Sequence, residues 1–269
     1  MGCEIVNFCV SHIFVFLLQR IVRDDIMTSV SKVSDTLFSP KYTISPFTLS
    51  LLDDSSWYKS EFRNVDSTVF GYGAGCDFLT EPCIADGSVP SHSQGVFCNE
   101  RIPFLAPNFP HPMLTKNACD VDYNNKAVCD LLDYDDELSF AFGSGLDPPP
   151  ANFQYFTSPT LGVFYNRNAD FCPMREMLLQ VDCTDELREA DFAYDTYSID
   201  SRCFNTDQTK AVCLRSKCNA DTGKIEGLLR DVNQEFICDF DGQVKFFAVD
   251  PPEASFTFVC PPVRHFCPQ

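Results

Sequence analysis

The alternation of apolar and polar positions predicts short helices and strands instead of long periodic elements. Around Ile44–Leu52, Ser45 can cap a helix, Pro46 suits its first position, and Leu49 and Leu52 continue an apolar face. Near the end of the chain, residues 235–240 and 243–249 flank Asp241-Gly242, which predicts a type I′ β-hairpin. Residues 255–260 predict a further strand.

The segments between these elements are rich in turn-forming residues. The glycines of residues 71–75 predict a tight turn, because the sequence lacks the Lys and the following helix of a phosphate loop. Residues 83–150 are rich in Pro, Asn and Asp, which favours a loop-rich structure. Residues 184–189 have acids in a possible first turn and predict a short capped helix.

Cysteine content separates this chain from ordinary cytosolic proteins. The 269 residues include 15 cysteines, of which 13 lie from Cys76 to Cys267, and no C-x-x-C pair occurs. This pattern disfavours zinc ribbons and thioredoxin-like sites and favours a disulfide framework formed in an oxidising compartment. Because 13 is an odd number, at least one of these thiols needs a partner elsewhere.

The charge and the N-terminal segment limit the classes of partner. A formal net charge of −18 repels phosphate backbones and anionic lipid headgroups, so nucleic-acid binding is not expected. The apolar run of residues 5–18 is too short to span a bilayer and has the length of a signal-peptide core. Glu4 and Gln19-Arg20 depart from the signal-peptide pattern, so residues 1–19 are a weak signal peptide or foreign to the domain. Membrane association therefore stays open.

The search for catalytic chemistry begins with the four histidines, which are His12, His92, His111 and His265. None belongs to the H-E-x-x-H motif, in which two imidazoles bind zinc and the Glu activates water. A three-histidine site from His92, His111 and His265 is conceivable, but single surface histidines are much commoner. The run from Asp120 to Asn124 begins like a calcium loop, yet Asn125 and Leu131 stand where Gly and the bidentate Glu are needed.

Several segments resemble, in the right order, the C-terminal part of the leishmanolysin family of zinc metallopeptidases. The most specific is Gly75-Cys-Asp-Phe-Leu-Thr-Glu-Pro-Cys83, and the others are Arg20–Thr28, Leu49–Tyr58, Phe153–Phe156, Ala169–Pro173, Asp182–Asp185 and Ser201–Phe204. The resemblance implies a secreted or cell-surface endopeptidase that acts on proteins or peptides and has a role in cell adhesion.

The resemblance also implies a zinc cofactor that this chain is not expected to bind. Two zinc histidines and the catalytic glutamate of the family lie in a region upstream of the matched segments. The position of the third histidine is Phe16 in this chain. Met27 alone carries over, as the methionine of the Met-turn, which forms an apolar floor beneath the metal. We therefore expect no catalytic or metal-ligating residue here, and no peptidase activity from this chain alone.

The resemblance further implies a disulfide pairing, which spacing alone could not choose. The implied pairs are Cys83–Cys172, Cys98–Cys129, Cys119–Cys203, Cys183–Cys213, Cys218–Cys267 and Cys238–Cys260. Cys76 is left over, because its counterpart in the family joins a cysteine upstream of the third zinc histidine. We therefore expect Cys76 to be unpaired, the chain to be truncated, and the isolated protein to be aggregation-prone or weakly stable.

The expected fold class is α+β, with three parts. Residues 1–19 are an unmatched apolar segment, residues 20–81 are a remnant of the family's central domain with the Met-turn, and residues 82–269 form a disulfide-rich, loop-rich domain with antiparallel strands. Three functional hypotheses stay open: a peptidase whose catalytic half is missing, a non-catalytic extracellular binding or adhesion module, and a degraded gene without a stable product.

Overall fold

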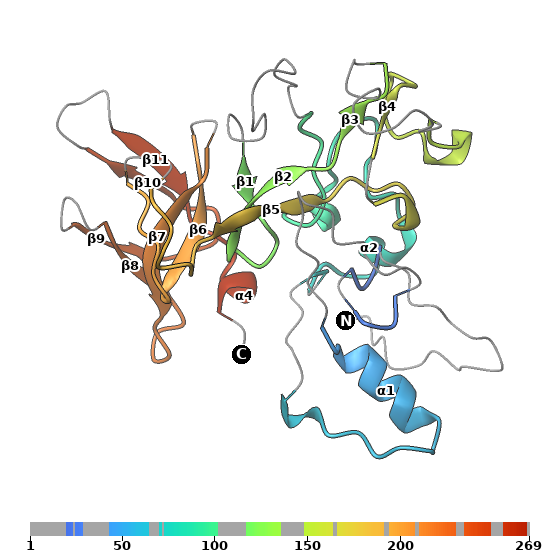
Figure 1. Ribbon diagram of the computed structural model, residues 1–269, viewed down its shortest axis with the longest axis horizontal. Helices are drawn as coiled ribbons and strands as arrows, with labels where there is room; N and C mark the ends of the chain where they lie inside the picture. Colours follow the sequence, from blue (N-terminus) through green and yellow to red (C-terminus); the bar gives the residue numbers. More distant parts are fainter. Residues whose placement is uncertain are drawn as a thin grey trace. The chain divides into compact units, whose positions relative to one another are not determined.

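Antiparallel strands dominate the computed structural model of the chain (Figure 1). The structure describes residues 20–23, 25–28, 43–64, 70–71, 73–101, 117–135, 148–163, 166–190, 194–207, 210–229, 234–248 and 255–267. The chain divides into two units. The first comprises Met1–Ser34, Pro40–Asn99 and Leu131–Met174, and the second comprises Asp35–Ser39, Glu100–Asp130 and Arg175–Gln269. The expected boundary between residues 81 and 82 stays a prediction.

The first unit is loop-rich and has few regular elements. Among its described residues, the helices are α1 (Pro46–Asp54), α2 (Asp77–Thr80) and the 3₁₀ turns η2 (Phe62–Asn64), η3 (Ser91–Ser93), η5 (Ala151–Phe153) and η6 (Asn166–Asn168). Strands β3 (Leu132–Asp133) and β4 (Leu161–Gly162) form a two-stranded antiparallel sheet. The rings of Phe70, Phe78 and Phe97 pack with centroids 5.6–6.0 Å apart and form a buried aromatic group.

Local sequence signals explain the first unit's helix and its glycine turn. As expected, α1 begins at Pro46, and the Ser45 hydroxyl accepts a hydrogen bond from the Thr48 amide as an N-cap. The glycine-rich turn is also confirmed, since Gly71, Gly73 and Gly75 all have positive φ. A Cβ on Gly71 would approach the Phe78 ring to 2.6 Å, so this glycine is also required by packing.

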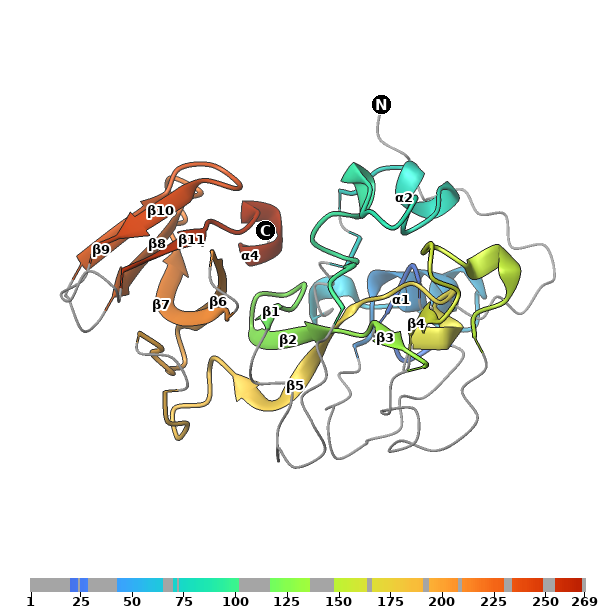
Figure 2. The same ribbon diagram turned by 90° about the horizontal axis from the view of Figure 1, so that it is seen from above.

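Two sheets lie among the described residues of the second unit. Strands β1 (Ala118–Cys119), β2 (Asn125–Cys129) and β5 (Arg175–Asp182) form one, in the order β1-β2-β5. The other has the order β10-β11-β6-β7-β8-β9. Its strands are β6 (Ser201–Thr206), β7 (Val212–Cys218), β8 (Ile225–Leu229), β9 (Gln234–Cys238), β10 (Val244–Phe247) and β11 (Phe256–Val259), and the short helix α4 (Val263–Phe266) follows (Figure 2).

Phenylalanines fill the core of the six-stranded sheet. Phe204 of β6, Phe236 of β9 and Phe258 of β11 are at most 5% exposed, with ring centroids 4.9–5.5 Å apart. Phe236 also lies 6.0 Å from Phe247 of β10. Because β9 and β10 are the two edges of the sheet, this contact shows that the sheet folds back on itself around the aromatic core.

The prediction of a β-hairpin at residues 235–249 is wrong, although a turn does form there. Gln243 N–H donates to the Phe240 carbonyl at 3.2 Å, and Gly242 has a φ of 75°. Asp241 is absent from the positive-φ residues, so the turn is not type I′, which needs positive φ at both central positions. The strands that the turn joins are not paired with each other: β9 pairs with β8, and β10 pairs with β11.

Residues 184–189 do not form the short helix expected there; they form turns. Asp182 Oδ1 accepts hydrogen bonds from the amide and hydroxyl of Thr184 at 2.8 and 2.7 Å, and Asp185 Oδ1 accepts the Leu187 amide at 3.1 Å. Carboxylates that bind nearby amides in this way compete with helical hydrogen bonds. The strand expected at residues 255–260 is confirmed as β11.

The fold class is confirmed in its coarser form, a disulfide-rich domain with antiparallel strands. The α+β label fits only loosely, because the α-helices in the described residues span 9, 4 and 4 residues. No helix of this described part is long and apolar enough to cross a bilayer.

Candidate functional site

A turn of residues 25–28 carries Met27, the one residue that the resemblance placed next to a metal. The turn is closed by its own backbone, since the Thr28 amide donates to the Asp25 carbonyl at 3.1 Å. The Ile26 amide donates to the Thr43 carbonyl at 2.9 Å, which ties the turn to the segment before α1. The turn is therefore held to the start of α1 by backbone contacts alone, before any side chain is considered.

The buried carboxylate of Asp25 links the same two segments a second time. Asp25 is 1% exposed, and its Oδ1 accepts the Met27 amide at 2.7 Å and the Thr48 hydroxyl at 2.5 Å. Its Oδ2 accepts the Ser45 amide at 3.1 Å and the Ser45 hydroxyl. One carboxylate therefore fixes both the turn and the N-terminus of α1, where a negative charge is also favourable.

Apolar side chains on this turn and on the segment before α1 face solvent. Ile26, Met27 and Ile44 are 57%, 45% and 47% exposed. Trp57, shortly after α1, is 85% exposed, whereas Leu49 and Leu52 are half-buried. An exposed apolar group of this kind marks a surface that another molecule can cover. The expected tendency to aggregate stays a prediction.

The polar residues around the turn do not form a zinc site. His92 is half-buried, and its Nε2 lies 3.3 Å from the Pro82 carbonyl oxygen. Every cysteine from Cys76 to Cys267 is disulfide-bonded, so none offers a thiolate. His12 and His111 lie outside the described residues, as does Phe16, and so does the side chain of His265. The described residues around the turn therefore offer no donor set that fits zinc.

The structure contains five of the implied disulfides. These are Cys83–Cys172, Cys119–Cys203, Cys183–Cys213, Cys218–Cys267 and Cys238–Cys260, with Cα–Cα distances of 5.4–5.9 Å. Cys98 and Cys129 are both disulfide-bonded, and their mutual pairing stays a prediction.

The expectation for Cys76 needs a correction, because Cys76 is disulfide-bonded in the structure. We expected a free thiol because the implied pairs use twelve of the thirteen cysteines from Cys76 onward, and because Cys3 and Cys9 lie before Arg20, where the motifs of the resemblance begin. An exposed thiol such as Cys76 in an oxidising compartment forms a bond with whatever cysteine it can reach, so the exclusion was not a physical argument.

The turn that begins at Asp120 uses its carboxylate to bind the backbone. Asp120 Oδ1 accepts the amides of Asn124 and Asn125 at 3.0 and 3.1 Å, and Oδ2 accepts the Asn125 side-chain amide at 2.7 Å. Tyr123 adopts a positive φ of 56° within the turn. The resemblance of this segment to a calcium loop in its first residues is thus explained by a tight turn between β1 and β2.

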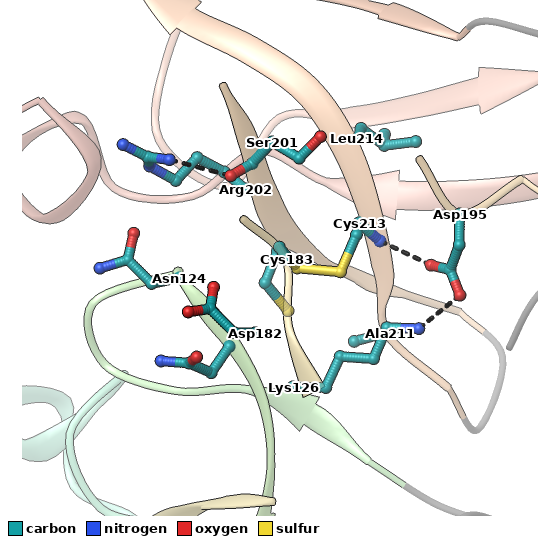
Figure 3. Close-up of a disulfide and its surroundings, with 12 residues drawn as sticks. Asn124, Lys126, Asp182, Cys183, Asp195, Ser201, Arg202, Ala211, Cys213 and Leu214 are labelled. Atoms are coloured by element: carbon teal, nitrogen blue, oxygen red, sulfur yellow. Dashed lines mark hydrogen bonds and ion pairs between the residues drawn. A yellow bond between two sulfur atoms is a disulfide. The ribbon is translucent and has the colours of Figure 1, made fainter. Parts of the chain in front are cut away.

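A buried ion pair, which the sequence did not indicate, lies beside the Cys183–Cys213 disulfide (Figure 3). Lys126 Nζ of β2 lies 2.6 Å from Asp195 Oδ2, and the two side chains are 1% and 0% exposed. Asp195 Oδ1 accepts the Cys213 amide at 2.8 Å. The ammonium also lies 5.7 Å from the centre of the Tyr197 ring. A paired, inaccessible lysine of this kind is a structural group and not a catalytic one.

Arg20, the first residue of the resemblance, binds segments of the first unit that are distant in sequence. Its guanidinium donates to the carbonyls of Phe78 and Glu81, and Nη1 lies 3.5 Å from Asp170 Oδ2. The Tyr155 hydroxyl donates to the Asp170 carbonyl at 2.9 Å. Burial raises the pKa of Tyr155, and the positive charge of Arg20 partly offsets this effect. These contacts stabilise the segment around the Cys83–Cys172 disulfide.

Comparisons with known proteins agree on one family. The Peptidase_M8 model, described as leishmanolysin, matches residues 8–268. A leishmanolysin homolog of Crithidia fasciculata is 24% identical over 265 residues, which cover 92% of this chain and 35% of that protein. A leishmanolysin-like peptidase of Drosophila pseudoobscura pseudoobscura is 25% identical over 219 residues, which cover 75% and 29% of the two chains. The chain thus spans about a third of the length of these curated relatives.

Proposed function

The chain belongs to the leishmanolysin family of peptidases, and from this membership we propose that it forms the disulfide-bonded, non-catalytic part of a zinc metalloendopeptidase. The observation that carries the proposal is the Met27 turn. Asp25 fixes the backbone of this turn, and the resemblance implies that Met27 forms the floor of a metal site. The substrate class that follows is the peptide bonds of proteins or peptides.

We assign the zinc ligands and the general base to residues outside this sequence. The support is the absence of H-E-x-x-H among the four histidines and the bonded state of the thirteen cysteines. Zinc in such a site polarises the scissile carbonyl and activates a water molecule. The part played by this chain is to hold the turn in place: Asp25 accepts the Met27 amide, and Ser45 and Thr48 hold Asp25.

An oxidising compartment follows from the same proposal. The thirteen disulfide-bonded cysteines from Cys76 onward would be reduced in a cytosolic environment. We therefore propose the secretory pathway, and the cell surface or the extracellular space as the final location.

The second candidate function is a non-catalytic extracellular binding or adhesion module. The observation that favours it is a set of exposed apolar side chains on the six-stranded sheet, including Val244 and Phe246, which are 63% and 64% exposed. The transcript sequence upstream of Arg20 discriminates between the two candidates. An in-frame H-E-x-x-H supports the peptidase, and a signal peptide joined directly to Arg20 supports the binding module.

A direct test uses the purified, oxidised chain. We expect metal analysis after dialysis to find no stoichiometric zinc, and a casein assay to detect no proteolysis that a chelator abolishes. The control is the same preparation incubated with excess zinc before dialysis, which should also lose the metal. Stoichiometric zinc retention with chelator-sensitive proteolysis would contradict the proposal, because this chain would then contain a complete active site.

A further inference from the structure

We propose that the edge strand β10 is a docking edge for an extended, positively charged segment of another protein. The inference is independent of the zinc proposal, since it uses only the second unit. Strand β10 stands at one end of the order β10-β11-β6-β7-β8-β9 and lies alongside β11 in both views (Figures 1 and 2). Its register with β11 pairs Val244 with Val259 and Phe246 with Thr257.

The hydrogen-bond alternation shows which backbone groups of β10 are open. The Cys260 amide donates to the Gln243 carbonyl at 2.8 Å. In an antiparallel pair the bonded residues alternate, so Lys245 and Phe247 are the next residues bonded to β11. Val244 and Phe246 then direct their N–H and C=O groups away from β11. Within the described part of the chain, β11 is the one strand with which β10 pairs.

The same two residues carry the exposed apolar side chains. Val244 and Phe246 are 63% and 64% exposed, and Val259 beside Val244 is 38% exposed. Sheet edges are commonly protected by an outward-facing charge, a proline or a bulge. The charge within β10 is Lys245, whose Nζ lies 3.7 Å from Asp239 Oδ2 and whose side chain is 25% exposed. The Lys245 side chain lies on the opposite face of the strand, so β10 contributes no charge to the face formed by Val244 and Phe246.

An extended segment can contact both the open backbone groups and the exposed apolar side chains of β10. Its backbone can pair with the open groups of Val244 and Phe246, and its alternate apolar side chains can cover the two exposed side chains, as in β-augmentation. The net charge of −18 selects between occupants. A second copy of this chain is repelled by its like charge, whereas a cationic segment is attracted. We therefore assign the edge to a basic strand of another protein.

A fluorescent peptide of the sequence Lys-Val-Lys-Phe-Lys-Val-Lys tests the proposal by anisotropy with the oxidised chain. We expect saturable binding that weakens with salt. Two reference peptides should bind much more weakly. One has Glu in place of Lys, and the other has backbone N-methyl groups on alternate residues, which remove the hydrogen bonds of one edge. Equal binding of either reference peptide would overturn the proposal, and so would the absence of saturable binding by the basic peptide.

The variant Val244→Thr/Phe246→Thr keeps strand-forming residues and removes the apolar surface. We expect it to weaken peptide binding at least about tenfold, because the apolar side chains of the peptide lose the apolar surface that they would cover. Leu187→Thr is the matched control, because Leu187 is 95% exposed and lies in a turn far from β10 in sequence; it should bind as the parent does.

Hydrogen exchange on the unsubstituted chain gives a readout that does not depend on the folding of a variant. The basic peptide should slow exchange of the Val244 and Phe246 amides and leave Lys245, which is already bonded to β11, nearly unchanged. Protection elsewhere without protection of these two amides would overturn the assignment. Dimerisation of the free chain through these amides would overturn the choice of occupant.

Discussion

Asp25 shows how one side chain can organise two segments. Its carboxylate is 20 positions before Ser45 and 23 before Thr48, yet it binds both and also the Met27 amide. The N-cap role of Ser45 could be predicted because a cap is decided by neighbouring residues. The role of Asp25 could not be predicted, because one of two consecutive acidic residues, Asp24-Asp25, is ordinarily assigned to the solvated surface. Its hydrogen-bond partners are brought together only by the fold.

Replacing Asp25 by Ala should lower the free energy of unfolding by about 3 kcal/mol, because two amides and two hydroxyls lose a buried, charged acceptor. Urea denaturation monitored by circular dichroism measures the change. Asp54→Ala is the control, since Asp54 is exposed at the end of α1 and should change stability by at most about 0.5 kcal/mol. Equal effects of the two substitutions would contradict the role of Asp25.

The lowered pKa of Asp200 predicts how its contribution to stability changes in acid. The side-chain hydrogen bond from Arg215 is the main cause that lowers the pKa of Asp200 from 3.8 to about 2, and Ser198 adds to it. Because the folded-state pKa is depressed, the stabilisation is complete above pH 3.8 and is lost as the pH falls through about 2. The contribution is small, since both side chains are more than 40% exposed.

NMR titration of the Asp200 carboxyl should therefore find its midpoint near pH 2 in the parent chain and closer to the ordinary value in Arg215→Gln. Lys217→Gln is a control on the same strand, because Lys217 pairs weakly with Glu226 at 4.0 Å. A parent midpoint near 3.8 would show that the bond to Arg215 does not persist in solution.

At the scale of elements, β9 and β10 show where local signals fail. Asp241-Gly242 correctly indicates a turn, but the pairing of the flanking strands is decided elsewhere. Gly227 of β8 lies opposite Phe236 of β9, and a Cβ on it would approach the Phe236 ring to 2.2 Å. The fit of this ring over a glycine favours the β8–β9 pairing, and it depends on a strand that a two-residue turn signal does not include.

Strand β2 shows a second limit, because Lys126 lies fully buried within it. A lysine in a sequence is ordinarily assigned to the surface. Here all five positions of β2 are buried, and Asp195, 69 positions away, supplies the counter-charge. The sequence does not indicate which acid is buried with which base, because a pair of this kind is defined only by the folded chain.

Lys126→Met should lower the free energy of unfolding by about 3–5 kcal/mol, because it leaves the Asp195 carboxylate buried without its ammonium. Lys126→Met/Asp195→Asn should recover part of the loss, since the buried charge is then removed. Lys224→Met is the matched control: Lys224 Nζ lies 2.7 Å from Asp239 Oδ1, but both side chains are over 40% exposed, so the loss should stay below about 1 kcal/mol. Equal losses at the two lysines would refute the distinction.

At the scale of the whole molecule, family resemblance contributed what composition could not. The cysteine count predicts a disulfide framework, but the pairing came from the family's motifs. Five of the implied pairs are present, whereas Cys76 was wrongly expected to be free. The error has a simple origin: the motifs that carried the resemblance begin at Arg20, so the cysteines before it were left out, yet a cysteine bonds to any sulfur within reach.

The lengths of the disulfide loops predict an order of stabilisation across the molecule. Cys83–Cys172 closes a loop with a sequence separation of 89, and Cys238–Cys260 one of 22. Restriction of the unfolded chain gives about 4.6 kcal/mol for the longer loop and about 3.4 kcal/mol for the shorter one.

All four cysteines are at most 1% exposed, so double replacement by Ala leaves comparable cavities in the two cases. The difference in stability is then decided by the entropy of the two loops in the unfolded chain. Urea denaturation of the two double variants should find Cys83→Ala/Cys172→Ala less stable by about 1 kcal/mol. The reverse order would show that residual structure in the unfolded chain, or packing around Cys238 in the phenylalanine core, outweighs chain entropy in this protein.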